Sequence, residues 1–292
     1  MIERVDGATL MVLQAGGILR EYYGSGYEVE SKGGIDLVTT ADHAVEEFIL
    51  GWIASRYPQD GVLAEESGGR DGTSEFRWVI DPLDGTVNFA HGLGHFSVLV
   101  ALQEKRQDGF ETLVSWTLDP MREELFVAQK GKGATLNGSR IRVSETTLLR
   151  QSLLCTGFGY DRLTNEADNH REFCRMNLLT RGVRRFGSAG LDLAYVACGR
   201  YDGFWERGLN PWDIAAGLLL VAEAGGVVTS VEGTAVELNV GSVLSANPKI
   251  YTPLKKALES AQEVPINSRK GIAAFLPAEE RIELIRAGLE DS

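Results

Sequence analysis

The sequence has only three cysteines and four histidines among 292 residues, and this scarcity limits the metal sites that it can build. Cys155, Cys174 and Cys198 are odd in number, widely spaced and form no CxxC pair. We therefore expect neither a disulfide framework nor a zinc site, and the default is a cytoplasmic protein with reduced thiols. No acidic residue beside His91 and His95 completes a zinc set, so we expect both histidines to be structural.

Positive charge is also scarce, because 29 lysines and arginines face 41 aspartates and glutamates, and the formal net charge is −12. Binding to nucleic acid or to an anionic membrane depends on a positive field, so this composition disfavours both partners. An acidic protein that handles anionic phosphates would, however, need cations in its site. Gly131-Lys132-Gly133 lacks the Gly-Lys-Ser/Thr ending of a Walker loop, so it is not a nucleotide-binding motif of that kind.

Long apolar runs are missing as well, and no segment approaches the length of a membrane span. The N-terminus, MIERVDG, has no basic region followed by an apolar core, so we expect no signal peptide. Internal repeats and low-complexity tracts are absent. Together with the chain length, these absences predict a soluble protein of about two globular domains or subdomains.

The N-terminal part of the chain predicts two helices followed by a sheet. Apolar residues at three- and four-residue spacing predict the helices at about 5–22 and 41–56, with a glycine-rich loop at 24–34 between them. Short segments rich in Val, Leu and aromatic residues follow, and their short connections favour antiparallel pairing. We expect these strands at 78–80, 96–103, 112–118 and 124–129.

Strand and helix then alternate, which predicts an α/β half packed as layers. We expect strands at 152–156, 182–186, 202–205, 227–229 and 242–245, and helices at 166–179, 191–198, 212–224 and 248–261. The chain therefore divides into an α+β half at 1–145, an α/β half at 146–262 and a C-terminal appendage at 263–292. Segment 277–289 has the spacing of an amphipathic helix, and we expect it to dock on its own chain.

The strongest chemical signal is Asp81-Pro82-Leu83-Asp84-Gly85-Thr86, directly after the apolar segment 78–80. The strand end fixes Asp81, and the turn returns Asp84 toward the same place, where two carboxylates repel each other unless a cation lies between them. Oxygen ligands favour a hard cation such as Mg²⁺. Gly85-Thr86 can begin a helical turn whose amides face a phosphate. The alternative is a surface turn, since Asp, Pro and Gly all favour turns.

Two further motifs carry acids. Leu63-Ala64-Glu65-Glu66-Ser67 has paired acids after a short apolar stretch, and Asn210-Pro211-Trp212-Asp213-Ile214-Ala215-Ala216-Gly217 has one acid at the start of an apolar helix. The alternatives are that the glutamates are solvated and that the aspartate complements the helix dipole.

These motifs occur in an order that resembles the signature of the inositol monophosphatase family, within the lithium-sensitive, metal-dependent phosphatase superfamily. The matching set is Asp42, Glu65-Glu66, Asp81-Pro82-Leu83-Asp84-Gly85-Thr86 and Trp212-Asp213-Ile214-Ala215-Ala216-Gly217. The resemblance covers about residues 1–261. It implies an αβαβα layered sandwich, usually a homodimer, with the site between the two halves.

The resemblance also implies a metal site with two to three Mg²⁺ ions. Glu66, Asp81 and the backbone carbonyl of Leu83 would hold the first ion, and Asp81, Asp84 and Asp213 the second. Glu66 would reach a weaker third ion through water. Most of these ligands lie in the half at 1–145, whereas Asp213 lies in the half at 146–262.

The same resemblance assigns the catalytic and phosphate-binding roles. Gly85 and Thr86 would bind phosphate through their amides. The Thr86 hydroxyl, paired with Asp42, would help Glu66 to orient and deprotonate the attacking water. Such a division of labour agrees with the chemistry of metal-assisted hydrolysis.

Substrate-binding residues are implied in the second half. Gly187-Ser188-Ala189 matches the small-residue segment beside the substrate ring, and Glu206 matches the acid that accepts hydrogen bonds from substrate hydroxyls. The alternative for Glu206 is a surface acid next to Arg207. Lys32 is displaced by one position from the lysine that the family often carries. For the basic cluster at 181–185 we expect a solvated or dimer-contacting face.

We therefore expect a phosphoric monoester hydrolase that acts on small phosphate monoesters, with inositol 1-phosphate as the first candidate substrate. The alternatives are a histidinol-phosphate phosphatase, a fructose-1,6-bisphosphatase and a phosphatase of 3′-phosphoadenosine 5′-phosphate, because the metal motifs are common to relatives with these activities. Specificity would come from loops such as 157–162 and 187–190. Outside the enzymes, the alternative is a regulatory protein that binds transcription machinery.

Overall fold

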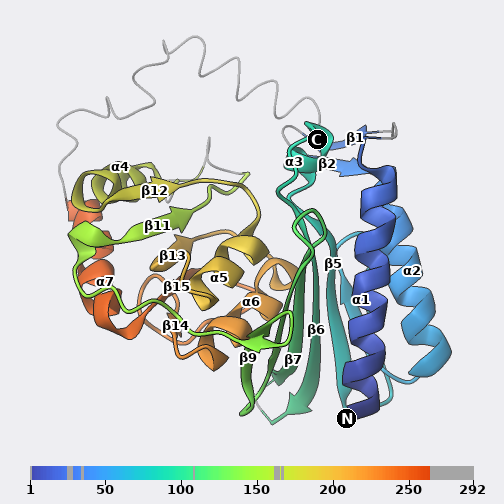
Figure 1. The fold of residues 1–292 in the computed structure, drawn as a ribbon. Helices are drawn as coiled ribbons and strands as arrows, with labels where there is room; N and C mark the ends of the chain where they lie inside the picture. Colours follow the sequence, from blue (N-terminus) through green and yellow to red (C-terminus); the bar gives the residue numbers. More distant parts are fainter. Residues whose placement is uncertain are drawn as a thin grey trace.

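The computed structural model describes residues 2–24, 29–33, 36–107, 109–160, 165 and 168–263. These residues form five layers in the order helix, sheet, helix, sheet, helix (Figure 1). The layered αβαβα sandwich expected from the sequence is therefore confirmed. The helices are α1 (Ile2–Tyr22), α2 (Thr40–Arg56), α3 (Thr86–Ala90), α4 (His170–Leu179), α5 (Ala189–Ala197), α6 (Pro211–Glu223) and α7 (Pro248–Glu263), with one 3₁₀ turn, η1 (Leu149–Gln151).

The larger sheet has eight strands in the order β10-β9-β8-β7-β6-β5-β3-β4. All neighbouring strands pair antiparallel except β3 and β5, which are parallel. Its strands are β3 (Gly61–Ala64), β4 (Gly68–Arg70), β5 (Phe76–Asp84), β6 (Ser97–Arg106), β7 (Gly109–Asp119), β8 (Glu124–Gln129), β9 (Gly133–Leu136) and β10 (Ser139–Arg140). The expected antiparallel strands are present, whereas β3, β4, β9 and β10, each of two to four residues, were not expected from the sequence.

The smaller sheet has five strands in the order β12-β11-β13-β15-β14. Strand β11 lies parallel to both β12 and β13, and β15 lies antiparallel to its two neighbours. The strands are β11 (Leu153–Thr156), β12 (Gly182–Arg184), β13 (Gly203–Glu206), β14 (Val227–Thr229) and β15 (Val243–Ala246). This agrees with the alternation of strand and helix predicted for the second half.

Each helix layer takes its place from the distribution of its apolar residues. Helix α1 buries one stripe against the large sheet, namely Val5, Ala8, Met11, Val12, Ala15 and Leu19. Every residue of α5 is buried, as expected for a helix that lies between two sheets and meets protein on all sides. The middle layer therefore joins the two sheets through α5 and α6, and the site described below lies where these helices begin.

Two further segments differ from the sequence prediction. The region expected to be a glycine-rich loop contains β1 (Val29–Gly33), which pairs antiparallel with β2 (Asp36–Thr39) as a separate two-stranded sheet. The helix expected from residue 166 begins at His170, because Asn169 has a φ of 67°, which no α-helix accepts. The amphipathic segment 277–289 lies outside the described residues. In the part of the chain that is described, no helix combines the length and the apolar character needed to cross a membrane.

Candidate active site

A cavity of about 500 Å³ opens where β5, α3, α5 and α6 meet. One part of its wall, which we call the acidic end, is formed by four carboxylates: Glu65, Asp81, Asp84 and Asp213. Another part, the recognition end, is formed by Gly157, Arg185 and Glu206. Thr86, Gly85, the Leu83 backbone, and Gly187, Ser188 and Ala189 also line it. The structure thus brings together most of the residues that the sequence proposed for the site.

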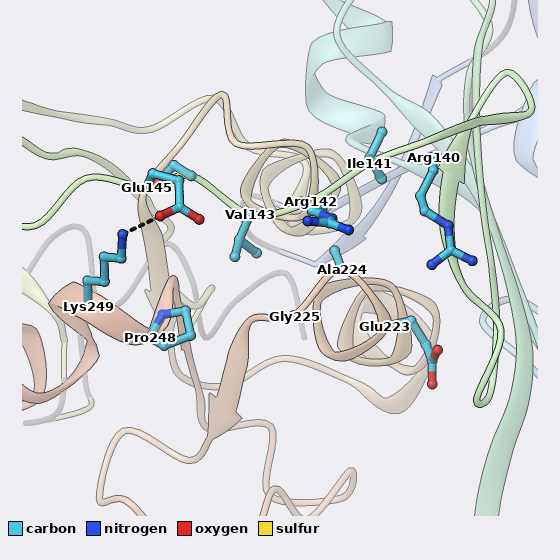
Figure 2. Close-up of a pocket in the computed structure, with 11 residues that line it drawn as sticks. Arg140, Ile141, Arg142, Val143, Glu145, Glu223, Ala224, Gly225, Pro248 and Lys249 are labelled. Atoms are coloured by element: carbon cyan, nitrogen blue, oxygen red, sulfur yellow. Dashed lines mark hydrogen bonds and ion pairs between the residues drawn. The ribbon is translucent and has the colours of Figure 1, made fainter.

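A second cavity, of about 360 Å³, lies between the segment 140–145, the end of α6 and the start of α7 (Figure 2). Its acids are already engaged with the chain itself. Glu145 pairs with Lys249, and Glu223 accepts hydrogen bonds from two glycine amides of the β8–β9 turn. No set of acids converges there as it does in the larger cavity, so the larger cavity is the candidate active site.

Asp81 lies among the other three acids of the acidic end. It lies near the end of β5, is almost completely buried, and accepts a hydrogen bond of 3.0 Å from the backbone amide of Leu83. Burial raises its pKa well above the ordinary value, and the charges of Glu65, Asp84 and Asp213 raise it further. Four acids that disfavour one another's ionisation form a site that a cation would stabilise.

Asp84 connects the two halves of the molecule. Its carboxylate accepts hydrogen bonds from Ser97 Oγ (2.9 Å) and Ser188 Oγ (2.5 Å), and from the amides of Ala189 (3.1 Å) and Gly190 (2.9 Å) at the start of α5. These hydrogen bonds lower its pKa, whereas burial raises it more. Two of the residues predicted to bind substrate, Ser188 and Ala189, therefore donate to a carboxylate of the acidic end.

Asp213 lies in the first turn of α6 and forms a capping box with Asn210. Its Oδ2 accepts a hydrogen bond of 2.7 Å from the Asn210 amide, which lowers its pKa, but burial and the charges of Asp84 and Glu65 raise the pKa well above the ordinary value. The capping box accounts for an aspartate in the first turn of an otherwise apolar helix. The start of α6 lies at the cavity, so Asp213 also faces the other acids there.

The sequence prediction assigned the glutamate of the site to Glu66, and the structure corrects this by one residue. Glu65 lines the cavity and raises the pKa of Asp81. Glu66 is not among the lining residues, and its amide donates instead to Glu46 of α2 (2.9 Å). Consecutive residues leaving a strand point to opposite sides, so only one of the pair can face the cavity.

The parallel pairing of β3 with β5 decides which glutamate that is. Ala64 lies opposite Ile80, so the next residue along each strand brings Glu65 level with Asp81. The Glu65 amide also donates to the Ile80 carbonyl at 3.2 Å, which continues the pairing past the strand end. If β3 had been predicted from the sequence as a parallel partner of β5, its register would have indicated Glu65 as the acid that faces the cavity.

Thr86 and Asp42 meet as predicted. The Thr86 hydroxyl lies 3.3 Å from Asp42 Oδ1 and 3.0 Å from the Leu83 carbonyl oxygen, so it can donate to either. Asp42 is the acid of the capping box of α2 and also accepts hydrogen bonds from the Thr39 amide (2.8 Å) and hydroxyl (2.6 Å). Asp42 is not among the lining residues, and it contacts the cavity wall through the Thr86 hydroxyl.

Gly85 has a backbone conformation that favours glycine. Its φ is 97°, and a Cβ atom would lie 3.2 Å from the carbonyl oxygens of Gly187 and His95. Glycine at this position therefore lets the start of α3 approach the segment before α5. This close approach sets the width of the cavity between its two halves.

Glu206 ends β13 and is 8% exposed, so it is not the surface acid that the sequence left open. Burial raises its pKa to about 8, opposed by the positive charge of Arg185 and supported by the negative charge of Asp84. Arg185 is exposed, as expected for the basic cluster at 181–185, and it also lines the cavity. In the sequence, Arg185 stands two residues before Gly187, and this proximity to a predicted substrate-binding segment was the sign that Arg185 could reach the cavity. The side chain of Lys32 lies outside the described residues.

The carboxylates of the acidic end are candidate ligands for a cation. Among the described residues, no three His, Cys, Asp or Glu side chains are already arranged as a metal cage. Asp81, Asp84 and Asp213 each accept a hydrogen bond from a backbone amide. The donor set nevertheless fits Mg²⁺, which prefers oxygen, needs few carboxylates and keeps several waters.

Comparison with known proteins gives a consistent result. A family model described as the inositol monophosphatase family matches residues 3–263. An inositol-1-monophosphatase from Synechocystis sp. is 46% identical over 258 residues, which cover 88% of this chain and 88% of the relative. The Nus factor SuhB of Pseudomonas aeruginosa is 44% identical, with 79% of this chain and 86% of the relative covered. The solved inositol monophosphatase from Anabaena (Nostoc) is 43% identical, with a TM-score of 0.78 and coverage of 87% of this chain and 94% of that one.

Proposed function

The chain belongs to the inositol monophosphatase family and is a phosphatase, and from this premise we propose that it hydrolyses small phosphate monoesters with Mg²⁺, inositol 1-phosphate first among them. The observation that carries the proposal is the acidic end of the cavity, where burial and three neighbouring acids raise the pKa of Asp81. Buried carboxylates that lie close together repel one another when ionised, and a divalent cation bound between them would offset this repulsion.

The ligand set that we propose follows the sequence resemblance with one change, Glu65 in place of Glu66. Glu65, Asp81 and the Leu83 carbonyl would hold one Mg²⁺, and Asp81, Asp84 and Asp213 a second. A third, weaker ion would be reached from Glu65 through water. When bound, Mg²⁺ lowers the pKa of water and offsets negative charge on the phosphoryl group and on the leaving alkoxide.

The protein's own contribution to catalysis is to orient water and phosphate. Thr86, held by Asp42 and by the Leu83 carbonyl, has a hydroxyl at a fixed position beside the acidic end. With Glu65 as the base, this hydroxyl would orient the attacking water and Glu65 would accept its proton. The amides of Gly85 and Thr86, at the start of α3, would donate to phosphate oxygens.

The choice of inositol 1-phosphate rests on the recognition end and on the name of the Synechocystis relative. Glu206 is a buried carboxylate in reach of a ring bound between the Gly187–Ala189 segment and Gly157, and substrate hydroxyls would donate to it. Histidinol phosphate could pair its ammonium group with the same acid, so histidinol phosphate and fructose 1,6-bisphosphate are the alternative substrates.

Phosphate release from a panel of esters tests the proposal. The panel contains inositol 1-phosphate, histidinol phosphate, fructose 1,6-bisphosphate, 3′-phosphoadenosine 5′-phosphate and propyl phosphate, each with Mg²⁺ and with EDTA. We expect Mg²⁺-dependent turnover, highest on inositol 1-phosphate and inhibited by Li⁺. Faster turnover of histidinol phosphate would change the substrate and keep the mechanism. Equal turnover in EDTA would refute the role of the metal.

A second candidate function comes from the relatives named Nus factor SuhB, which are 43–44% identical to this chain. A regulatory protein of this kind would bind transcription machinery, and its binding would persist in a variant without phosphatase activity. The homodimer and the cytoplasmic location are predictions from the sequence. Sedimentation of the purified protein at micromolar concentration tests the dimer.

A further inference from the structure

Asn169 is a buried polar residue in a backbone conformation that few side chains accept. It precedes α4, is 3% exposed and has φ and ψ of 67° and −1°. Asparagine is one of the few residues other than glycine that adopt this left-handed conformation readily. Its side chain is thereby turned back from α4 toward the smaller sheet.

The Asn169 amide joins two neighbouring strands of that sheet. Its Nδ2 donates to the Gly157 carbonyl at 2.6 Å and to Thr156 Oγ1 at 2.7 Å, where β11 ends. Its Oδ1 accepts from the indole Nε1 of Trp205 in β13 at 2.5 Å. Thr156 and Trp205 lie opposite each other in the parallel pair, so one side chain holds both strands where they reach the cavity.

The groups that Asn169 holds are the immediate surroundings of Glu206. Trp205 is its neighbour in β13. Gly157 lies so close that a Cβ atom there would be 2.1 Å from Glu206 Oε1. A small movement of the Gly157 backbone would therefore change the space available to the Glu206 carboxylate.

Helix α4 contacts the segment that contains Gly157 and Phe158 through aromatic side chains. Phe158, which lines the cavity beside Gly157, lies 4.9 Å from His170 and 5.7 Å from Phe173 between ring centroids. Arg207, which follows Glu206, pairs with the buried Glu172 of α4 at 2.8 Å. The start of α4 thus contacts the chain on both sides of the recognition end.

We propose that Asn169 is a positioning residue for substrate recognition, which ties Gly157 to the strand that carries Glu206 and so fixes the recognition end of the cavity. The inference rests on the proposed function, because it assigns Glu206 to the non-phosphate part of the substrate. Asn169 touches neither the acidic end nor the phosphate-binding amides. Its loss acts on the recognition of the ring and leaves the hydrolysis of a substrate without a ring nearly unchanged.

The test compares Asn169→Asp with a matched control, Asn247→Asp. Aspartate keeps the size, the left-handed backbone and the acceptor for Trp205, but sets a carboxylate oxygen against the Gly157 carbonyl. Asn247 is also fully buried in the second half, and its Nδ2 donates to a hydroxyl and a carbonyl, Ser144 Oγ at 2.8 Å and Thr146 O at 3.1 Å. It does not line the cavity.

The measurements are kcat and KM for inositol 1-phosphate and for propyl phosphate, and Tm. We expect Asn169→Asp to lower kcat/KM about tenfold on inositol 1-phosphate, mainly through KM, as the loss of one hydrogen bond to substrate predicts. The loss on propyl phosphate should stay within a few-fold. Asn247→Asp should lower Tm and leave the ratio of the two substrates unchanged. In a Glu206→Gln background, Asn169→Asp should change this ratio no further.

Equal losses on both substrates would overturn the inference, as would a ratio that Asn247→Asp changes to the same extent. If Asn169→Asp does not fold, Asn169→Gly replaces it, because glycine accepts the positive φ and has no side chain. The ratio of kcat/KM on inositol 1-phosphate to kcat/KM on propyl phosphate is then measured for this variant, with the same expected result. If the unsubstituted protein hydrolyses the esters but substitution of Asn169 leaves the ratio of the two kcat/KM values unchanged, only this inference is refuted. A parent without Mg²⁺-dependent turnover of any ester refutes the proposed function.

Discussion

The acidic end and the recognition end of the cavity are built in different ways. Asp81 and Asp84 of the acidic end lie on β5, Glu65 follows the strand paired with it, and Asp213 lies in the first turn of α6. At the recognition end, Gly157 and Arg185 follow β11 and β12, and Glu206 ends β13. Three of the four acids of the acidic end are therefore placed by one pair of strands. The recognition end depends on how a helix layer holds several strand ends together.

This difference indicates how each end responds to substitution. An acid of the acidic end acts directly on charge, so its neutralisation should remove activity on every substrate. A residue of the recognition end contacts only the variable part of a substrate, so its loss should change preference. Substitutions at both ends of the cavity, compared on substrates with and without a ring, test this contrast.

Asp81→Asn should abolish Mg²⁺-dependent turnover on all substrates, because Asp81 is shared by both proposed ions. The fold should persist, and in EDTA the variant should be at least as stable as the parent, since a buried acid with a raised pKa becomes a neutral amide. Turnover and circular dichroism check this. Asp71→Asn, at an exposed acid, is the control. Activity within a few-fold of the parent would refute the assignment.

Glu65→Gln and Glu66→Gln form a matched pair at neighbouring positions. We expect Glu65→Gln to lower kcat by about a hundredfold or more on every ester, as expected for the loss of a catalytic base. Glu66→Gln should stay within a few-fold of the parent, because Glu66 does not line the cavity. Steady-state kinetics with saturating Mg²⁺ separate the two. A larger loss of kcat in Glu66→Gln than in Glu65→Gln would show that Glu66 is the glutamate of the site.

Glu206→Gln should lower kcat/KM on inositol 1-phosphate about tenfold, while propyl phosphate loses much less. A hydrogen bond between a buried acid and a substrate hydroxyl contributes about 1–3 kcal/mol, which sets this scale. The ratio of the two kcat/KM values is the measurement. An equal loss on both substrates would show that Glu206 supports the acidic end instead.

The last prediction concerns the dependence of stability on pH. Burial raises the pKa of Glu206 from 4.5 to about 8, so the folded state binds this proton more tightly than the unfolded state. The stabilisation is complete below the unfolded pKa and is lost as pH rises toward about 8, by at most about 1.4 kcal/mol per pH unit. Urea unfolding in EDTA at pH 5.5 and 7.5 measures it.

The control for this pH effect is Glu206→Gln, which cannot ionise. The free energy of unfolding of the parent, relative to this variant, should decrease between the two pH values. A constant difference would mean that Glu206 has the same pKa in the folded and unfolded states, and would contradict its burial among acids.

Most of the fold could be predicted because its signals are local. The apolar stripe of α1, the short strands of the larger sheet and the alternation in the second half each appear within about twenty residues of sequence. The exceptions lack such a signal. Strand β3 has only four residues, and the start of α4 is delayed by the backbone conformation of Asn169. Hydrophobic periodicity contains neither kind of information.

For the site, the residue types and their order along the chain were enough to predict acids and oxygen ligands, and their resemblance to a known family indicated a phosphatase. Which acid of the glutamate pair faces the cavity depends on the parallel register of β3 on β5, which brings Glu65 level with Asp81. The folded chain also brings Arg185 to the cavity wall and places the Asn169 amide against the Gly157 carbonyl beside Glu206. Such facts depend on contacts between segments far apart in the chain, and a local pattern records only the neighbours of a residue in sequence.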